Sequence, residues 1–190
     1  MKTQDEKVHL WTLPTGLSFA RILSVPLICF LISLEENRFF LISFFLFVFA
    51  GITDGLDGFF ARRLKINSKF GVYIDPVADK MLVASCLITL SYYRIVPLWL
   101  TLLHVLREFF VNGLRGLYAS EGVTIFPGRS AKFKTALQIL GISLILFNRS
   151  FPEPIFQQGI YPEPGLIVLI IALFFGLYSA AEYLFTIKKS

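Results

Sequence analysis

The chain has 190 residues, of which 55% are hydrophobic and 16% aromatic. A water-soluble domain of this size could not bury so much apolar surface, so the composition excludes that class and indicates an integral membrane protein. The net charge of +5 alone would fit a nucleic-acid-binding protein. In a membrane protein the positions of the charges matter more, and we expect no nucleic-acid partner.

Six apolar segments follow a polar N-terminal stretch, and most approach the roughly 20 residues that a helix needs to cross a bilayer. The segments span residues 16–34, 39–60, 70–93, 95–117, 133–147 and 165–187. The preceding residues 1–14 lack a signal-peptide pattern and fit either a short amphipathic surface helix or an irregular tail. The sequence therefore predicts a single all-α domain over residues 1–190, a polytopic membrane protein with six transmembrane helices.

The basic residues are distributed unevenly between the two sides of this predicted bundle. With an even number of spans both termini lie on one side, and 15 of the 18 Lys and Arg residues fall there. Only Arg38, Arg94 and Arg149 fall on the other side. Because loops rich in Lys and Arg stay in the cytosol, we expect cytosolic termini, and the lack of a leader pattern favours a bacterial inner membrane.

Two pairs of aspartates lie where the second apolar segment ends and the third begins. Asp54 and Asp57 are three residues apart, and Asp75 and Asp79 are four apart, so each pair shares one face of a helix. Only 17 residues separate the pairs, which places all four carboxylates at the cytosolic ends of two antiparallel neighbours. An Asp deep in a membrane costs about 2.5–3.5 kcal/mol, so we interpret the cluster as functional.

Four like charges at one place need nearby cations. Arg62, Arg63 and Lys80 could supply them, and so could divalent metal ions. Oxygen ligands with no His or Cys beside them favour magnesium, manganese or calcium over zinc. Metal ions beside basic residues, at a cytosolic face open to lipid, suit phosphoryl transfer from a diphosphate. A carboxylate that binds no metal could then serve as general base.

Other residues of the apolar segments have structural interpretations as well. Gly51 fits close helix packing, whereas Gly58 and Gly71 fit the close approach of a ligand to the backbone. Pro76 would fit the first turn of the third helix. We interpret His104, a lone histidine in an apolar segment, as a packed or hydrogen-bonded residue rather than a metal ligand.

Residues 54–79 carry a spacing that resembles the signature of a known family. In this chain it is Asp54-x2-Asp57-Gly58-x2-Ala61-Arg62-x8-Gly71-x3-Asp75-x3-Asp79. Every fixed position matches the CDP-alcohol phosphotransferase family, which is a more specific signal than a lone Gly-rich motif. The resemblance implies a six-helix membrane enzyme, generally a homodimer. Such an enzyme transfers the lipid-linked phosphate of a CDP-activated lipid to an alcohol and releases CMP.

The resemblance also implies roles for individual residues. The ligands of two divalent cations, Mg2+ or Mn2+, would be Asp54, Asp57, Asp75 and Asp79. Asp79, the last of the four, would also be the general base. The residues along the CDP-lipid would be Gly58, Ala61, Arg62 and Gly71. Apart from the resemblance, we expect Thr15 to reach a phosphate of the CDP-lipid as well.

Three further stretches resemble the branch of this family whose acceptor is sn-glycerol 3-phosphate. They are LPTGLSFARILSVP (13–26), LREFFVNGLRGL (106–117) and GRSAKFKTALQ (128–138). Ser18 and Ala131 stand where that branch usually has Thr and Gly. The resemblance implies CDP-diacylglycerol as donor and sn-glycerol 3-phosphate as acceptor, and beyond residue 138 it is a match of hydropathy only.

Basic residues at the cytosolic ends of the fourth and fifth segments fit an acceptor that is a dianion. Guanidinium and ammonium groups there could hold its phosphate. We expect this role for Arg107, Arg115, Lys132 and Lys134. Glu108, beside Arg107, could orient an arginine. The alternative for these cations is ordinary positive-inside charge.

Three other interpretations fit parts of the pattern. The same family could use a different acceptor: inositol phosphate, serine or phosphatidylglycerol. A carboxylate-lined divalent-cation transporter would also carry aspartate pairs, but no ionisable path continues through the last two segments. A prenyl-diphosphate enzyme would be expected to carry a contiguous Asp-Asp-x-x-Asp, which this chain lacks.

Overall fold

The computed structural model describes residues 13–64, 69–120, 128–154 and 163–187, and within them the chain forms six α-helices and no strand. The helices are α1 (Leu13–Ser33), α2 (Asn37–Leu64), α3 (Lys69–Tyr92), α4 (Leu98–Ser120), α5 (Arg129–Arg149) and α6 (Pro164–Ile187). The predicted bounds differ from these by no more than four residues, so the all-α prediction is confirmed.

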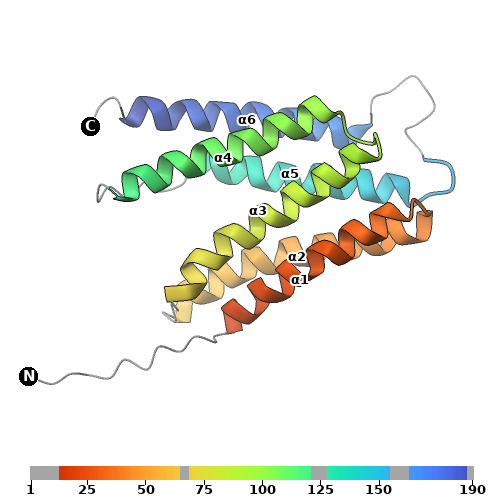
Figure 1. The fold of residues 1–190 in the computed structure, drawn as a ribbon, viewed down its shortest axis with the longest axis horizontal. Coiled ribbons are helices and arrows are strands. Elements are labelled where there is room, and N and C mark those ends of the chain that lie inside the picture. Colours follow the sequence, from red (N-terminus) through yellow and green to blue (C-terminus); the bar gives the residue numbers. More distant parts are fainter. Residues whose placement is uncertain (1–12, 65–68, 121–127, 155–162, 188–190) are drawn as a thin grey trace, which may run out of the picture.

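The helices form two groups that cross at an angle (Figure 1). Helices α1, α2 and α3 pack on one another in one group, and α4 and α5 both pack on α6 in the other. Contacts of α2 with α5 and of α3 with α4 join the two groups. The start of α1, the end of α2, the start of α3 and the end of α6 all lie at one end of the bundle, which we call the α2–α3 end.

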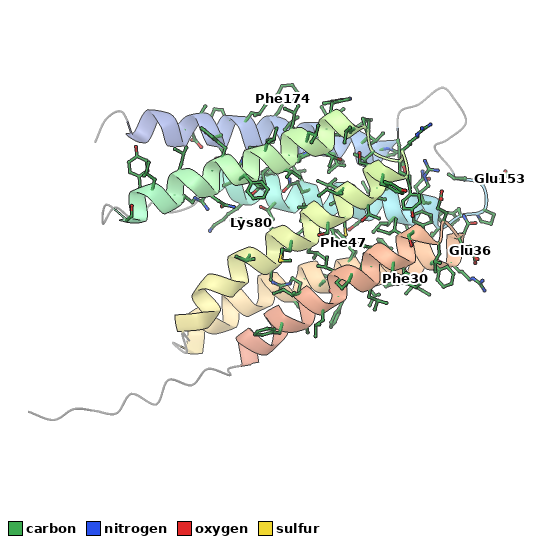
Figure 2. All side chains as sticks on the ribbon, viewed as in Figure 1. Phe30, Glu36, Phe47, Lys80, Glu153 and Phe174 are labelled. Carbon is green, nitrogen blue, oxygen red and sulfur yellow. The ribbon has the colours of Figure 1, made fainter. Side chains whose placement is uncertain are left out.

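One apolar core runs through both helix groups. Ile28 of α1, Phe47 of α2 and Ile142 of α5 are fully buried in it. Outward-facing positions also carry large apolar side chains, and Phe30 and Phe174 are 60% and 69% exposed (Figure 2). Apolar side chains on both the inside and the outside of a bundle are favoured by a bilayer rather than by water.

Two helices contain segments that are long and apolar enough to cross a membrane. These segments are Ser130–Arg149 of α5 and Pro164–Glu182 of α6. Shorter apolar stretches in the described residues are Phe19–Ser33, Asn37–Thr53 and Lys80–Tyr92. The apolar stretch of α2 ends at Thr53, just before the first aspartate, and that of α3 begins at Lys80, just after the last one. Six membrane crossings therefore stay a prediction, and in the described part of the chain two helices have the length and composition that a crossing requires.

The aspartate region is helical on both sides of its turn. Helix α2 continues without a break through Asp54 and Asp57 to Leu64. The prediction that Pro76 occupies a first helical turn is wrong, because α3 begins at Lys69 and Pro76 lies inside it. Proline cannot donate to the carbonyl group one turn earlier. A helix of 24 residues keeps its other backbone hydrogen bonds, and α3 therefore forms across this position.

Glycines allow α5 to approach its neighbours closely. A Cβ atom added at Gly165 of α6 would lie 2.6 Å from the carbonyl oxygen of Gly141 and 2.5 Å from Cγ1 of Ile145. On the other side of α5, a Cβ added at Gly51 of α2 would lie 3.3 Å from Cγ2 of Ile139, which confirms the predicted packing role of Gly51. Small residues thus hold α5 between α6 and α2.

Polar side chains join the helices at the end of the bundle opposite the α2–α3 end. Asn37, at the start of α2, donates hydrogen bonds to the carbonyl oxygen of Arg149, 2.9 Å away, and to that of Phe151. Asn148 donates to the carboxylate of Glu163, 3.0 Å away, just before α6. Burial raises the pKa of Glu163 above its usual range. These contacts tie α2, α5 and α6 together at this end.

Replacing Gly165 by Ala should destabilise the protein by about 1–3 kcal/mol, because the new Cβ would collide with the backbone of α5. Thermal unfolding in detergent measures the loss. Gly113→Ala is the matched control, since no atom lies within 4 Å of its added Cβ and alanine favours a helix. The unfolding temperature of this control should stay the same or rise, and equal losses in the two variants would refute the packing role of Gly165.

Candidate active site

The four predicted metal ligands lie on two helices that contact each other. Asp54 and Asp57 belong to the C-terminal half of α2, and Asp75 and Asp79 to the N-terminal half of α3. Their side chains lie outside the described part of the structure, as do those of Thr15, Gly58, Ala61, Arg62 and Gly71. Among the described side chains, no group of three or more His, Cys, Asp or Glu gathers. Metal binding at the aspartates therefore stays a prediction.

A buried arginine fastens α1 to α2 one turn before Asp54. Arg21 is 3% exposed, and its Nε donates to the carbonyl oxygen of Ala50 at 3.1 Å. The hydroxyl group of Thr53 donates to the same oxygen at 2.9 Å. A buried cation is costly unless an anion or a dipole faces it. Arg21 thus supplies fixed positive charge at the turn where α2 becomes acidic.

A carboxylate joins two of the predicted phosphate-binding cations. Glu108 of α4 accepts hydrogen bonds from Lys134 of α5 and from Nη1 of its neighbour Arg107, the latter at 3.1 Å. The side chains of Arg107 and Lys134 are 6% and 5% exposed, and that of Glu108 is 18% exposed. Because water screens these charges little, separating them would be costly. Two cations and one carboxylate leave one net positive charge in this group.

Arg107 also connects α4 to α6. Its Nε donates to the carbonyl oxygen of Gly176, and its Nη2 donates to the hydroxyl oxygen of Ser179, both at 3.0 Å. A Cβ added at Gly176 would lie 3.4 Å from Cγ and Cδ of Lys134. One turn of α6 therefore contacts both buried cations.

A second polar contact between α4 and α5 lies one helical turn away. His104 precedes Glu108 by four residues, and Gln138 follows Lys134 by four. Nε2 of Gln138 donates to Nδ1 of His104 at 2.9 Å, so Nε2 of His104 carries the proton and donates to the carbonyl oxygen of Leu169 at 3.1 Å. The prediction of a hydrogen-bonded histidine is confirmed.

Lys80 links this polar group to the helix that carries Asp79. Its ammonium group donates to Oδ1 of Asn112 on α4. Lys80, Glu108 and Lys134 help to line a cavity of about 20 Å³, which is large enough for one water molecule. A second cavity, of about 240 Å³, lies between α3 and α4 and is also lined by Lys80 and Glu108. Lys80, the residue after Asp79, thus lines a cavity together with Glu108 of α4 and Lys134 of α5.

The other two predicted phosphate-binding residues are more accessible. Lys132 is exposed on α5, and Arg115 is half-buried on α4, about two turns beyond Arg107. Lys132 and Lys134 are two residues apart, so they project in nearly opposite directions from the helix. The structure therefore brings Arg107 and Lys134 together around Glu108 and leaves Lys132 outside that group.

Sequence reasoning did not identify Asn112, Gly176 or Ser179. Gly176 and Ser179 are small residues in an apolar helix, where such residues usually indicate helix packing. A usable signal existed for Gln138, because it lies four residues from Lys134 on the same helix and so shares its face.

Comparison with known proteins identifies relatives over most of the chain. The profile of the family described as CDP-alcohol phosphatidyltransferase matches residues 11–178, so the similarity extends into α6. The CDP-diacylglycerol–glycerol-3-phosphate 3-phosphatidyltransferase of Bacillus subtilis (strain 168) is 33% identical over 186 residues, covering 92% of this chain and 94% of that protein. The protein of the same name from Pseudomonas fluorescens is 36% identical over 178 residues, covering 90% and 88%. A cardiolipin synthase (CMP-forming) from Oryza sativa subsp. japonica is 29% identical over 195 residues, covering 95% and 59%.

Replacing Glu108 by Gln should lower the free energy of unfolding by about 3 kcal/mol, because it leaves Arg107 and Lys134 buried without their shared anion. Unfolding by denaturant or heat in detergent measures the loss. Glu36→Gln is the matched control, since it removes a carboxylate from an exposed ion pair with Arg38 at 2.7 Å. Its effect should stay below about 1 kcal/mol. A loss just as small for Glu108→Gln would show that the two cations do not need this carboxylate.

Proposed function

Because the chain belongs to the CDP-alcohol phosphatidyltransferase family, we propose that it transfers the phosphatidyl group of CDP-diacylglycerol to sn-glycerol 3-phosphate. The products are phosphatidylglycerophosphate and CMP, and the reaction is a step of phospholipid biosynthesis. The observation that carries the proposal is the similarity, over 92% of this chain, to a Bacillus subtilis protein with that activity in its name. The basic residues on α4 and α5 agree with an anionic acceptor.

The acidic residues of α2 and α3 form the metal site in this proposal. The proposed ligands of two divalent cations, Mg2+ or Mn2+, are Asp54, Asp57, Asp75 and Asp79. Their places on two contacting helices support this assignment. When bound, such ions would neutralise the donor diphosphate as negative charge shifts to CMP. The proposed contacts of the CDP-lipid are Thr15, Gly58, Ala61, Arg62 and Gly71.

Asp79 is the proposed general base. Its carboxylate takes the proton of the acceptor's primary hydroxyl group while the hydroxyl oxygen attacks the lipid-linked phosphorus. The new oxygen–phosphorus bond replaces the bond from that phosphorus to the bridging oxygen, which leaves with CMP. The neighbour of Asp79, Lys80, lines a cavity together with Glu108 and Lys134, so the base belongs to a turn of α3 that meets the basic group.

The phosphate of the acceptor carries two negative charges and requires fixed positive charge. We assign that role to Arg107, Arg115, Lys132 and Lys134. Lys132 is exposed, and the buried group formed around Glu108 contributes one net positive charge. The protein interior screens charge poorly, so the buried group also attracts the acceptor phosphate, in addition to the exposed Lys132.

The membrane arrangement is part of the same proposal. We propose that residues 1–190 form one domain whose six helices cross a bacterial inner membrane, with the termini and the active site in the cytosol. The apolar outer surfaces of the helices and the uneven distribution of Lys and Arg support it. A surface helix before α1 would fall on residues outside the described part, and a homodimer rests on the family resemblance alone.

The choice of acceptor is the first test of this function. Purified protein in detergent, supplied with CDP-diacylglycerol and magnesium, should release CMP with sn-glycerol 3-phosphate. It should not do so with inositol phosphate, inositol, serine or phosphatidylglycerol. A chelator should stop the release if divalent cations take part. Release with another acceptor would keep the reaction class and replace the acceptor, whereas no release with any of them would refute the function and favour a cation transporter.

Asp79→Asn should lower kcat by about 10²–10⁴-fold, because an amide cannot take the proton of the attacking hydroxyl group. Binding of CDP-diacylglycerol should largely persist, because the other three proposed metal ligands remain and the asparagine still offers an amide oxygen. The CMP assay and a binding measurement separate the two effects. Glu153→Gln is the control, since it removes an exposed carboxylate at the opposite end of the bundle (Figure 2) and should leave kcat unchanged. An Asp79→Asn variant with nearly the kcat of the unaltered protein would exclude Asp79 as the base.

A further inference from the structure

One turn of α6, from Gly176 to Ser179, contacts both buried cations of the proposed acceptor site. We infer that this turn positions Arg107 and, through Glu108, also Lys134 for the phosphate of the acceptor. The inference rests on the proposed function. It assigns a role in the reaction to α6, whose small residues would otherwise be interpreted as helix-packing residues.

The nitrogen atoms of Arg107 all donate hydrogen bonds to protein groups. Nε contacts the carbonyl oxygen of Gly176 and Nη2 the hydroxyl group of Ser179, each at 3.0 Å, and Nη1 contacts Glu108 at 3.1 Å. Arg107 is 7% exposed, so its orientation is set from the side of α6. A guanidinium group held in this way keeps its charge and its hydrogen-bond partners in fixed places, so Arg107 also acts as a positioning residue for its neighbours.

Glu108 transmits this orientation to Lys134. Its carboxylate accepts hydrogen bonds from both cations, so the place of the Lys134 ammonium group depends on where Arg107 holds the carboxylate. Gly176 leaves room for the stem of the same lysine, because a Cβ added there would lie 3.4 Å from its Cγ and Cδ. Fixing a flexible lysine before the substrate arrives reduces the entropy lost on binding. The α6 turn should therefore lower the KM for the acceptor without taking part in the chemical step.

The group formed by Arg107, Glu108 and Lys134 also lies beside α3, the helix that carries the proposed base. Lys80, which follows Asp79 in α3, lines the water-sized cavity together with Glu108 and Lys134. Glycerol 3-phosphate carries its phosphate and its primary hydroxyl group at opposite ends of a three-carbon chain. Cations on α4 and α5 and a base on α3 suit a molecule with that distribution of groups.

Ser179→Ala tests the inference on the α6 side of the contact with Arg107. It removes one hydrogen bond to Arg107 and should raise the KM for sn-glycerol 3-phosphate about fivefold, with kcat and the KM for CDP-diacylglycerol unchanged. Tyr178→Phe is the matched control, because it deletes a hydroxyl group from the exposed neighbouring residue and should change none of the three constants. Thermal unfolding of each variant checks that the fold is intact.

Arg107→Lys separates position from charge. It keeps the positive charge, but one ammonium group cannot contact three partners in the geometry of a guanidinium, so the KM for the acceptor should rise here too. Adding Ser179→Ala to Arg107→Lys should then cause no further rise, because the hydroxyl group acts through the guanidinium.

The outcomes distinguish the inference from the function on which it rests. If the unaltered protein releases no CMP with sn-glycerol 3-phosphate, both fail. If it does release CMP, three results would overturn the inference alone: an unchanged acceptor KM in Ser179→Ala, equal rises in the KM of both substrates, or effects of Ser179→Ala and Arg107→Lys that simply multiply. A selective rise in the acceptor KM that is absent in the Arg107→Lys background would support it.

Discussion

The packing of α4, α5 and α6 depends on one carboxylate, that of Glu108, lying between two buried cations. In an apolar bundle an isolated lysine, arginine or carboxylate would lose its hydration without compensation. One carboxylate satisfies Arg107 and Lys134 only if α4 and α5 are in the right register and α6 is close enough to receive Arg107. Apolar surfaces alone would allow many packings of these helices, and the charged group favours one of them.

The same requirement explains the other buried polar contacts. Arg21 donates to the carbonyl oxygen of Ala50 and joins α1 to α2, whereas Gln138 and His104 join α5 to α4. At the opposite end of the bundle, Asn37 joins α2 to the end of α5. Each contact satisfies a buried or partly buried polar group, and each connects helices rather than residues of one helix. Polar pairing therefore determines how the apolar faces align.

The proposed metal ligands and the proposed acceptor-binding cations lie in different helix groups. Helices α2 and α3 hold the four aspartates, and α4 and α5 hold the basic residues proposed for the acceptor. In the proposed reaction, the acidic residues bind the metal ions that hold the donor diphosphate, and the basic residues bind the phosphate of the acceptor. Helix α3 joins the two regions, because Lys80 donates to Asn112 of α4 one residue after the proposed base.

The sequence by itself determined the six helices and the two that carry the aspartate pairs, since apolar runs and helical spacing depend only on neighbours in the chain. It misplaced Pro76, because proline favours a first helical turn whereas α3 begins seven residues earlier, at Lys69. Lys132 and Lys134 were equivalent as sequence, and only the rotation of α5 against α4 and α6 exposed one and buried the other. Tertiary structure also paired Arg107 with Ser179, 72 residues away. That pairing depends on which faces of α4 and α6 meet, and no local pattern contains that information.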